Sequence, residues 1–113
     1  MVFLTTSLGA CALAHEPIPR YGPEVPMNGI YWSNFEVSQF QGCDTEFALD
    51  AFRQMNAMVG EHDGRDGRNV QLVAVGMRSL GNRKPGHGYG LMGYAPCRIT
   101  ITRVFSARLR PQP

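Results

Sequence analysis

The clearest secondary-structure pattern in the chain is Arg98-Ile99-Thr100-Ile101-Thr102-Arg103-Val104-Phe105-Ser106-Ala107-Arg108-Leu109. Its residues alternate between apolar and polar, which is typical of a β-strand with one face against a core. Arg103 interrupts the alternation, so we expect a β-bulge or a change of face there. The residues expected to point inward are Ile99, Ile101, Phe105, Ala107 and Leu109.

Two earlier stretches also predict strands. Residues 29–40 (GIYWSNFEVSQF) are rich in aromatic and β-branched residues and predict one strand. We expect one of its faces to carry Tyr31, Phe35 and Val37. Residues 70–77 have apolar side chains on both faces, which predicts a well-buried strand.

Residues 44–58 predict an amphipathic helix between these strands. Asp44-Thr45-Glu46 has the residue types of an N-cap and a first helical turn, and Gly60 suits the C-terminal end. The apolar residues that follow have near-helical spacing, so we expect them to pack against the sheet. Those expected to be buried are Phe47, Phe52 and Met55.

The composition is that of one small globular domain, which we place at residues 29–110. The chain of 113 residues is 43% hydrophobic and has a net charge of +2. This charge is too small for the dense basic patch that nucleic acids require. The expected elements indicate an α+β fold, either a small α+β domain or a partly open antiparallel β-barrel with one helix.

Residues 1–14 predict an export signal. Leu8-Gly9-Ala10-Cys11 has the pattern of a lipobox, whereas Ala12-Leu13-Ala14 has the small-x-small pattern of an ordinary signal-peptidase site. The first predicts a bacterial lipoprotein anchored by Cys11 at the periplasmic face of the outer membrane, and the second a soluble periplasmic protein. A plain N-terminal segment is the alternative, because residues 1–10 contain no Lys or Arg.

Residues 15–28 contain four prolines and a glycine. Proline restricts its own backbone and that of the preceding residue, which favours an extended chain. This segment is predicted to be either a stiff tether between anchor and domain or an extended arm packed on the domain.

Cys43 and Cys97 are the two cysteines that remain once Cys11 is lipidated or removed. In an oxidising compartment an even pair of cysteines persists as a disulfide. We therefore predict a disulfide between Cys43 and Cys97.

The order of motifs resembles a family of small uncharacterised bacterial exported proteins. Two segments carry the resemblance: Phe35-Glu36-Val37-Ser38-Gln39-Phe40 followed by Cys43, and Gly88-Tyr89-Gly90-Leu91-Met92-Gly93 before the terminal strand. The resemblance covers most of residues 29–109 and implies a small OB-like barrel, but it implies no activity. Leu91 stands where that family usually has histidine, and Cys97 has no expected counterpart there.

The glycine-rich loop 81–97 is the best candidate for a binding surface. Aromatic residues on such loops are common where sugars, peptides or partner proteins bind. The alternative is that these aromatic side chains plug the end of the barrel. The candidate binding residues are His87, Tyr89, Met92 and Tyr94 in the loop, together with Trp32 and Tyr31 from the first strand.

Other constellations favour structural roles. Gly88-x-Gly90-x-x-Gly93 has the letters of a dinucleotide fingerprint, but Pro96 and a strand follow it where the fingerprint requires a helix. The histidines lack ligand spacing, and the expected disulfide would occupy the thiols, so we predict no metal site and no cofactor. No serine lies in a nucleophile elbow, and we predict no enzymatic activity.

These observations predict a non-catalytic interaction module of the bacterial cell envelope, with a protein or a small ligand as its partner. The alternative is a soluble periplasmic binding protein for a small molecule, a sugar or a metal ion. A nucleic-acid partner is not expected.

Overall fold

The computed structural model describes residues 19–62 and 66–111. They form, in chain order, β1 (Val25–Ser33), β2 (Ser38–Phe40), β3 (Cys43–Phe47), α2 (Leu49–Val59), β4 (Arg68–Arg78), a short 3-10 helix (Leu91–Gly93) and β5 (Arg98–Arg110). The expected export signal, with Cys11, lies outside the described residues, as do residues 15–18 of the expected tether.

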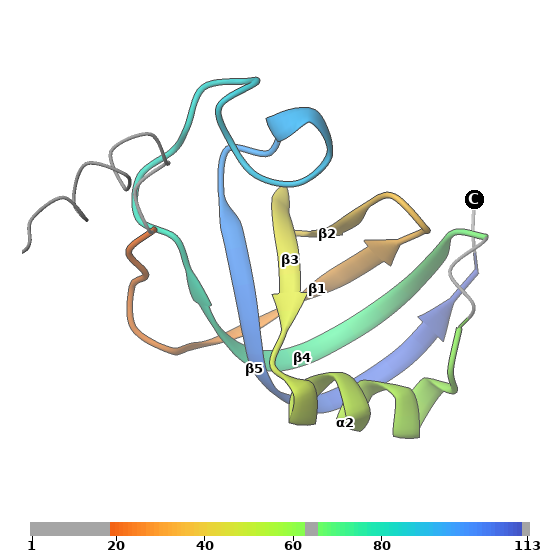
Figure 1. Ribbon diagram of the computed structural model, residues 1–113. Helices are drawn as coiled ribbons and strands as arrows, with labels where there is room; N and C mark the ends of the chain where they lie inside the picture. Colours follow the sequence, from red (N-terminus) through yellow and green to blue (C-terminus); the bar gives the residue numbers. More distant parts are fainter. Residues whose placement is uncertain (1–18, 63–65, 112–113) are drawn as a thin grey trace, which may run out of the picture.

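The strands close into a barrel in the order β1-β2-β3-β5-β4, with β4 pairing back to β1 (Figure 1). β3 and β5 are parallel, whereas the other neighbouring strands are antiparallel. α2 connects β3 to β4 and lies at the opposite end of the barrel from the 81–97 loop. The predicted α+β class, a small OB-like barrel with one helix, is confirmed. The barrel is closed rather than partly open, and it is mixed rather than wholly antiparallel.

β4 and β5 form the longest ladder of the barrel. Alternate residues of β4 from Arg68 to Gly76 are buried. β5 remains paired with β4 along the ladder, with two register shifts opposite residues 73–76. At one shift the amide of Val104 donates a hydrogen bond to Oε1 of Gln54 in α2, at 2.9 Å. The helix therefore satisfies a backbone amide of β5 beyond Ile101, the last residue of β5 that pairs with β3.

The bulge expected near Arg103 is confirmed, and it changes which residues of β5 face inward. The two isoleucines before it are fully buried, and after it Val104 is buried while Phe105 is exposed. The prediction that Phe105 points inward is wrong, because an extra residue shifts the alternation of side chains there. Leu109 pairs with the buried Val70 and so lies on the inward side as predicted, but its side chain is exposed near the end of the strand.

The helix begins at Leu49 and not at Asp44. Residues 43–47 instead form β3, which pairs with β5, and Ala48 precedes the helix without a side-chain cap. Pairing with β5 and burial of Thr45 override the local preference of Asp44-Thr45-Glu46 for a helix start.

Three residues of the expected helix were predicted to be buried, and the structure places them in different environments. Met55 is fully buried, as predicted. Phe47 is partly buried against the core, and its ring meets that of Tyr31 edge-on with centroids 5.0 Å apart. Phe52 is 44% exposed, so the prediction that it is buried is wrong. The buried face of α2 carries Ala51 and Met55, and Phe52 is turned roughly 100° around the helix from Ala51.

A turn at residues 34–37 divides the strand expected over residues 29–40 into β1 and β2. Oδ1 of Asn34 accepts hydrogen bonds from the amides of Glu36 and Val37, at 2.9 and 2.7 Å. This is the local side-chain bonding by which asparagine favours turns. Phe35 lies in the turn and is exposed, whereas Tyr31 is buried, so the prediction that these two residues share one face of a strand is wrong.

Residues 19–28, the described part of the expected tether, form an arm packed on the barrel. Tyr21 makes a β-bridge with Ser79, and residues from Val25 onward belong to β1. Pro26 is tolerated in β1 because β2 pairs only with residues 31–33, which leaves β4 as the paired neighbour at the proline. The globular domain therefore starts before residue 29.

The core is continuous through the barrel and under α2. The largest fully buried side chains are Phe40, Met55, Leu72, Ile99, Ile101, Val70, Cys43 and Cys97.

Among the described residues, no helix has the length and apolar character needed to cross a membrane.

Candidate functional site

The predicted disulfide between Cys43 and Cys97 is present, with the two Cα atoms 4.8 Å apart. It ties the end of the 81–97 loop to the start of β3. The amide of Asp44 also donates to the carbonyl oxygen of Cys97, at 3.0 Å. One end of the loop is therefore held to the barrel by a covalent bond and by a backbone hydrogen bond.

The loop is internally bonded and is not a structureless connection. The amides of Gly86 and Gly88 both donate to the carbonyl oxygen of Gly93, at 2.9 Å each. Tyr89 and Ala95 form a β-bridge. The glycines predicted to serve the shape of the loop thus lie in a tight hairpin-like fold, with no following helix that could bind a pyrophosphate group.

Tyr89 is buried beneath the loop and supports it. Its side chain is only 7% exposed, and its ring is covered by the guanidinium carbons of Arg83 and Arg98, 4.4 and 4.9 Å from the ring centroid. Such cation–π contacts stabilise the position of the ring. For Tyr89 the structure matches the alternative in which the aromatic residue plugs the barrel end.

Arg98 links Tyr89 to the acidic residues of β3. Its Nε lies 2.8 Å from Oδ2 of Asp44, and its Nη1 lies 3.8 Å from Oε1 of Glu46. Burial by itself would lower the pKa of Arg98, but the hydrogen bond to Asp44 and the charges of Asp44 and Glu46 outweigh it and raise the pKa above its ordinary value. These carboxylates therefore serve to hold the loop end in place.

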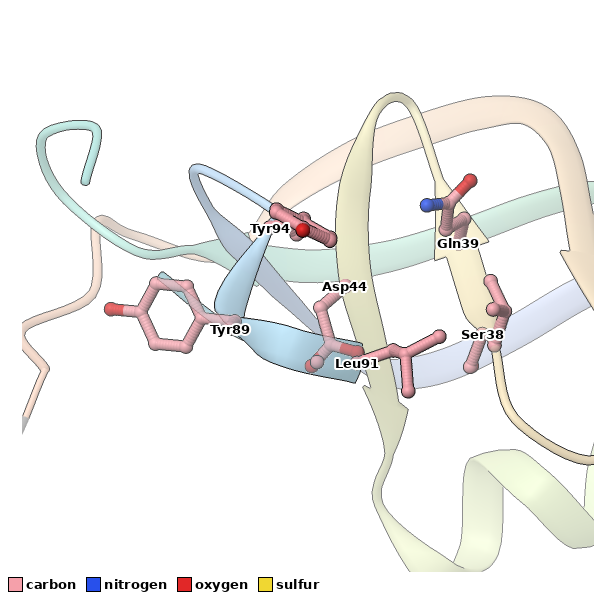
Figure 2. A pocket seen from close by; sticks show the side chains of 9 residues that line it. Ser38, Gln39, Asp44, Tyr89, Leu91 and Tyr94 are labelled. Carbon is pink, nitrogen blue, oxygen red and sulfur yellow. The ribbon is translucent and has the colours of Figure 1, made fainter. Parts of the chain in front are cut away.

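A small pocket of about 120 Å³ lies between β2 and the loop (Figure 2). In Figure 2, Leu91 points from the loop towards Ser38 of β2, with Asp44 beside it. Small-molecule sites usually have volumes of about 300–1,000 Å³, so this pocket is large enough for one side chain rather than for a whole ligand. Its lining residues are Val37, Ser38, Gln39, Asp44, Tyr89, Gly90, Leu91, Tyr94 and Ala95.

Gly90 allows the loop to approach Asp44 closely. Its φ is +72°, in the left-handed region, and a Cβ at this position would lie 2.8 Å from Oδ1 of Asp44. Any other residue would be strained and would collide with the carboxylate. The wall of the pocket thus depends on a glycine here.

Three apolar side chains of the loop are exposed beside the pocket: Leu91 and Tyr94 line it, whereas the predicted binding residue Met92 lies between them in the chain and is not part of the lining. Leu91 is 51% exposed, Met92 is 69% exposed and Tyr94 is 62% exposed. Met92 adopts a φ of +56°, which is uncommon for a residue with a side chain. We call Leu91, Met92 and Tyr94 the apolar rim.

The other predicted site residues have different positions. His87 is exposed in the same loop but does not line the pocket. Trp32 is not in the pocket lining: its ring covers Gly67 so closely that no side chain would fit there. Tyr31 is buried in the core, where its hydroxyl group lies 2.7 Å from that of Ser38.

The β2 and β3 side of the pocket was not predicted from the sequence. Ser38, Gln39 and Asp44 lie on two short strands that the sequence pattern merged into a longer strand and a helix. The motif segment from Phe35 to Phe40 was recognised, but its pattern carried no indication that it would face the loop.

Among the described residues, the hydroxyl group of Ser38 in the pocket makes hydrogen bonds within the barrel. The Ser38 hydroxyl donates to the carbonyl oxygen of Thr45 at 2.9 Å and contacts Tyr31, with no histidine beside it. Across residues 19–62 and 66–111, no three His, Cys, Asp or Glu side chains gather as a metal-binding group.

A second, wider hollow of about 540 Å³ lies beside α2. It was not predicted, because Phe52 was expected to be buried. Its lining residues are Leu49, Phe52, Arg53, Asn56, Ala57, Glu61 and His62.

Comparisons of the chain with protein-family models, with curated proteins and with solved structures found no match. The OB-like fold is therefore established by the strand order and by the position of the helix. The resemblance to an exported bacterial family stays a prediction.

Proposed function

We propose that this protein is a non-catalytic interaction module that binds a protein partner at the pocket between β2 and the 81–97 loop. The observation that carries the proposal is the apolar rim, which is exposed although the loop beneath it is held by a disulfide and by internal hydrogen bonds. Exposed apolar side chains on a rigid support are typical of interaction sites, because little conformational entropy is lost on binding.

The position of the pocket supports this proposal. In OB-type barrels, the face of the second and third strands and the loops beside it commonly bind ligands. Here that face meets the loop between β4 and β5. This support is an analogy at the level of the fold. The pocket has room for one side chain, so we expect the partner to insert a single side chain into it.

The proposed location is the bacterial cell envelope, with Cys11 as the lipidated residue of an outer-membrane lipoprotein. The support is the lipobox pattern together with the disulfide, which persists in oxidising compartments. Metabolic labelling with palmitate should mark the parent but not a Cys11→Ser variant. Absence of label in the parent, with a mature N-terminus after Ala14, would favour the soluble periplasmic alternative.

That alternative, a soluble periplasmic binding protein, is favoured by one observation. The polar side chains of Ser38, Gln39 and Asp44 lie in the same pocket as the ring of Tyr94, and sugars are commonly bound by aromatic rings together with polar groups. The volume of about 120 Å³ would limit such a ligand to a small terminal group.

Site-specific crosslinking in intact cells tests the interaction site. A photo-reactive phenylalanine analogue replaces Tyr94 in one variant and Arg53, which is exposed on α2, in a control variant. We expect a discrete protein adduct from position 94, weakened by an added Met92→Ser substitution, and none of the same size from position 53. Equal adducts from both positions, or none from position 94 in a folded protein, would contradict the proposal.

A further inference from the structure

The arginines of the barrel are concentrated on one side of it. β1, β4 and β5 together contain no Asp or Glu. The acidic residues of the other strands are Asp44 and Glu46 in β3, which pair with Arg98. The arginines of β4 and β5 are Arg68, Arg78, Arg98, Arg103, Arg108 and Arg110.

Three of these arginines face outward on one sheet face. In the β4–β5 ladder, Arg103 pairs with Val75, and Arg108 pairs with Gln71. Paired residues of neighbouring strands project on the same side, and the buried residues of β4 are the alternate ones. Arg103, Arg108 and Arg110 are all exposed, and among the described residues no carboxylate forms an ion pair with them.

The same face exposes apolar side chains between the arginines. Ile30 pairs with Gln71 across β1 and β4, and Val73 lies two residues further along β4. Both are about two-fifths exposed, and Phe105, beneath the guanidinium group of Arg103, is half exposed. We call Ile30, Val73, Phe105 and the three arginines the basic sheet face.

From this juxtaposition we infer that the basic sheet face docks on the surface of an anionic phospholipid bilayer. Arginines beside exposed apolar residues suit the interface of a membrane, where phosphate groups meet buried acyl chains. A soluble polyanion would pair with the arginines but would leave Val73 and Ile30 exposed to water. Neither of the two pockets described above is lined by a residue of β4 or β5, which fits a flat target better than a ligand that needs a cavity.

Trp32 provides a built-in reporter for this docking. It is the one tryptophan of the chain, it is partly exposed, and it pairs with Asn69, which in turn pairs with Arg110. It therefore projects from the edge of the basic sheet face. This inference is independent of the proposed function, because it uses neither the apolar rim nor lipidation of Cys11.

The test uses the full chain without an attached acyl chain, with vesicles of phosphatidylcholine alone or mixed with about one third phosphatidylglycerol. We expect co-sedimentation with the anionic vesicles, a blue shift of Trp32 emission, and loss of both at high salt, where charge attraction is screened. Replacing Arg103, Arg108 and Arg110 together by Gln should weaken partitioning at least about tenfold. A matched variant with Arg20, Arg53 and Lys84 changed to Gln has the same net charge and should retain most of the binding.

A Phe105→Ser variant separates a bilayer from a soluble polyanion. It should weaken vesicle partitioning but leave unchanged any retention on a heparin column. Circular dichroism and thermal unfolding confirm that each variant is folded. Four results would overturn the inference: no vesicle binding by the parent, equal binding to neutral vesicles, equal loss in the two charge variants, or binding of polyanions only.

Discussion

Two arginines at opposite ends of the barrel, Arg98 partly buried and Arg68 buried, are satisfied in different ways. At the loop end, Arg98 meets the carboxylates of Asp44 and Glu46, and its pKa is raised. At the helix end, Arg68 is 8% exposed and donates only to neutral oxygens, the carbonyl of Gly60 at 2.9 Å and Oδ1 of Asn56 at 3.2 Å. Among the residues that the structure describes, its Nε has no hydrogen-bond partner.

The difference has a consequence for stability. Burial lowers the pKa of Arg68, and the nearby Tyr31 offsets this only in part. A lowered pKa means that the charged form of Arg68 disfavours folding at every pH where arginine is protonated, whereas the raised pKa of Arg98 means that its charge favours folding over the same range. The loop end is thus held by a disulfide and by charge pairing, and the helix end by apolar packing and neutral hydrogen bonds.

Removal of the disulfide should have the largest effect. Cys43→Ala with Cys97→Ala should lower the free energy of unfolding by about 4 kcal/mol, because the crosslink spans 54 residues and restricts the unfolded chain. Urea unfolding measures the loss. Hydrogen exchange should show that the amides of Tyr89 and Ala95 lose protection before those of β4. A uniform loss of protection would mean that the loop end has no separate stability.

The helix end is tested by truncating two side chains of α2. Met55→Ala removes a fully buried side chain and should cost about 3 kcal/mol. Phe52→Ala is the matched control: its side chain is almost half exposed, and its loss should cost about 1 kcal/mol. Thermal unfolding compares the two. Equal losses would indicate that Phe52 is as buried in solution as the sequence pattern predicts.

The two arginines provide the direct test of the comparison. Arg98→Met should cost about 1–2 kcal/mol, a value reduced by partial exposure, because it leaves Asp44 without its charge partner. Arg68→Met should change the free energy of unfolding by less than about 1 kcal/mol, because the lost hydrogen bonds are offset by removal of a buried charge. Adding Asp44→Asn to Arg98→Met should restore part of the loss. If Arg68→Met lowered the free energy of unfolding more than Arg98→Met, the proposed difference between the two arginines would be wrong.

A pair of glycine substitutions tests the wall of the pocket. Gly81 and Gly90 both have φ near +70°, but a Cβ on Gly81 meets nothing within 4 Å, whereas one on Gly90 meets Asp44. Each alanine variant should lose about 1 kcal/mol for the left-handed backbone, and Gly90→Ala about 1 kcal/mol more for the collision. Equal unfolding midpoints would show that the pocket wall tolerates a side chain.

Local sequence patterns predicted parts of the fold correctly. They failed where the pairing of distant strands determined the structure. The alternation in residues 98–109 predicted β5 and its bulge, and parity of the cysteines predicted the disulfide. The start of the helix was predicted too early, because Asp44-Thr45-Glu46 has a good capping sequence but is used as a strand beside β5. The turn at Asn34 was missed, because aromatic and β-branched residues continue through it.

The sequence by itself determined the class of the fold, the disulfide and the loop that carries the apolar rim, since strand alternation, cysteine number and glycine content are local or countable properties. Only the tertiary structure decided that Tyr89 is buried beneath two arginines while Leu91, Met92 and Tyr94 stay exposed. It likewise decided that Trp32 lies at the edge of the basic sheet face and not in the pocket. These outcomes depend on which strands become neighbours when the barrel closes, and that pairing joins residues too far apart in the chain for any local pattern to record.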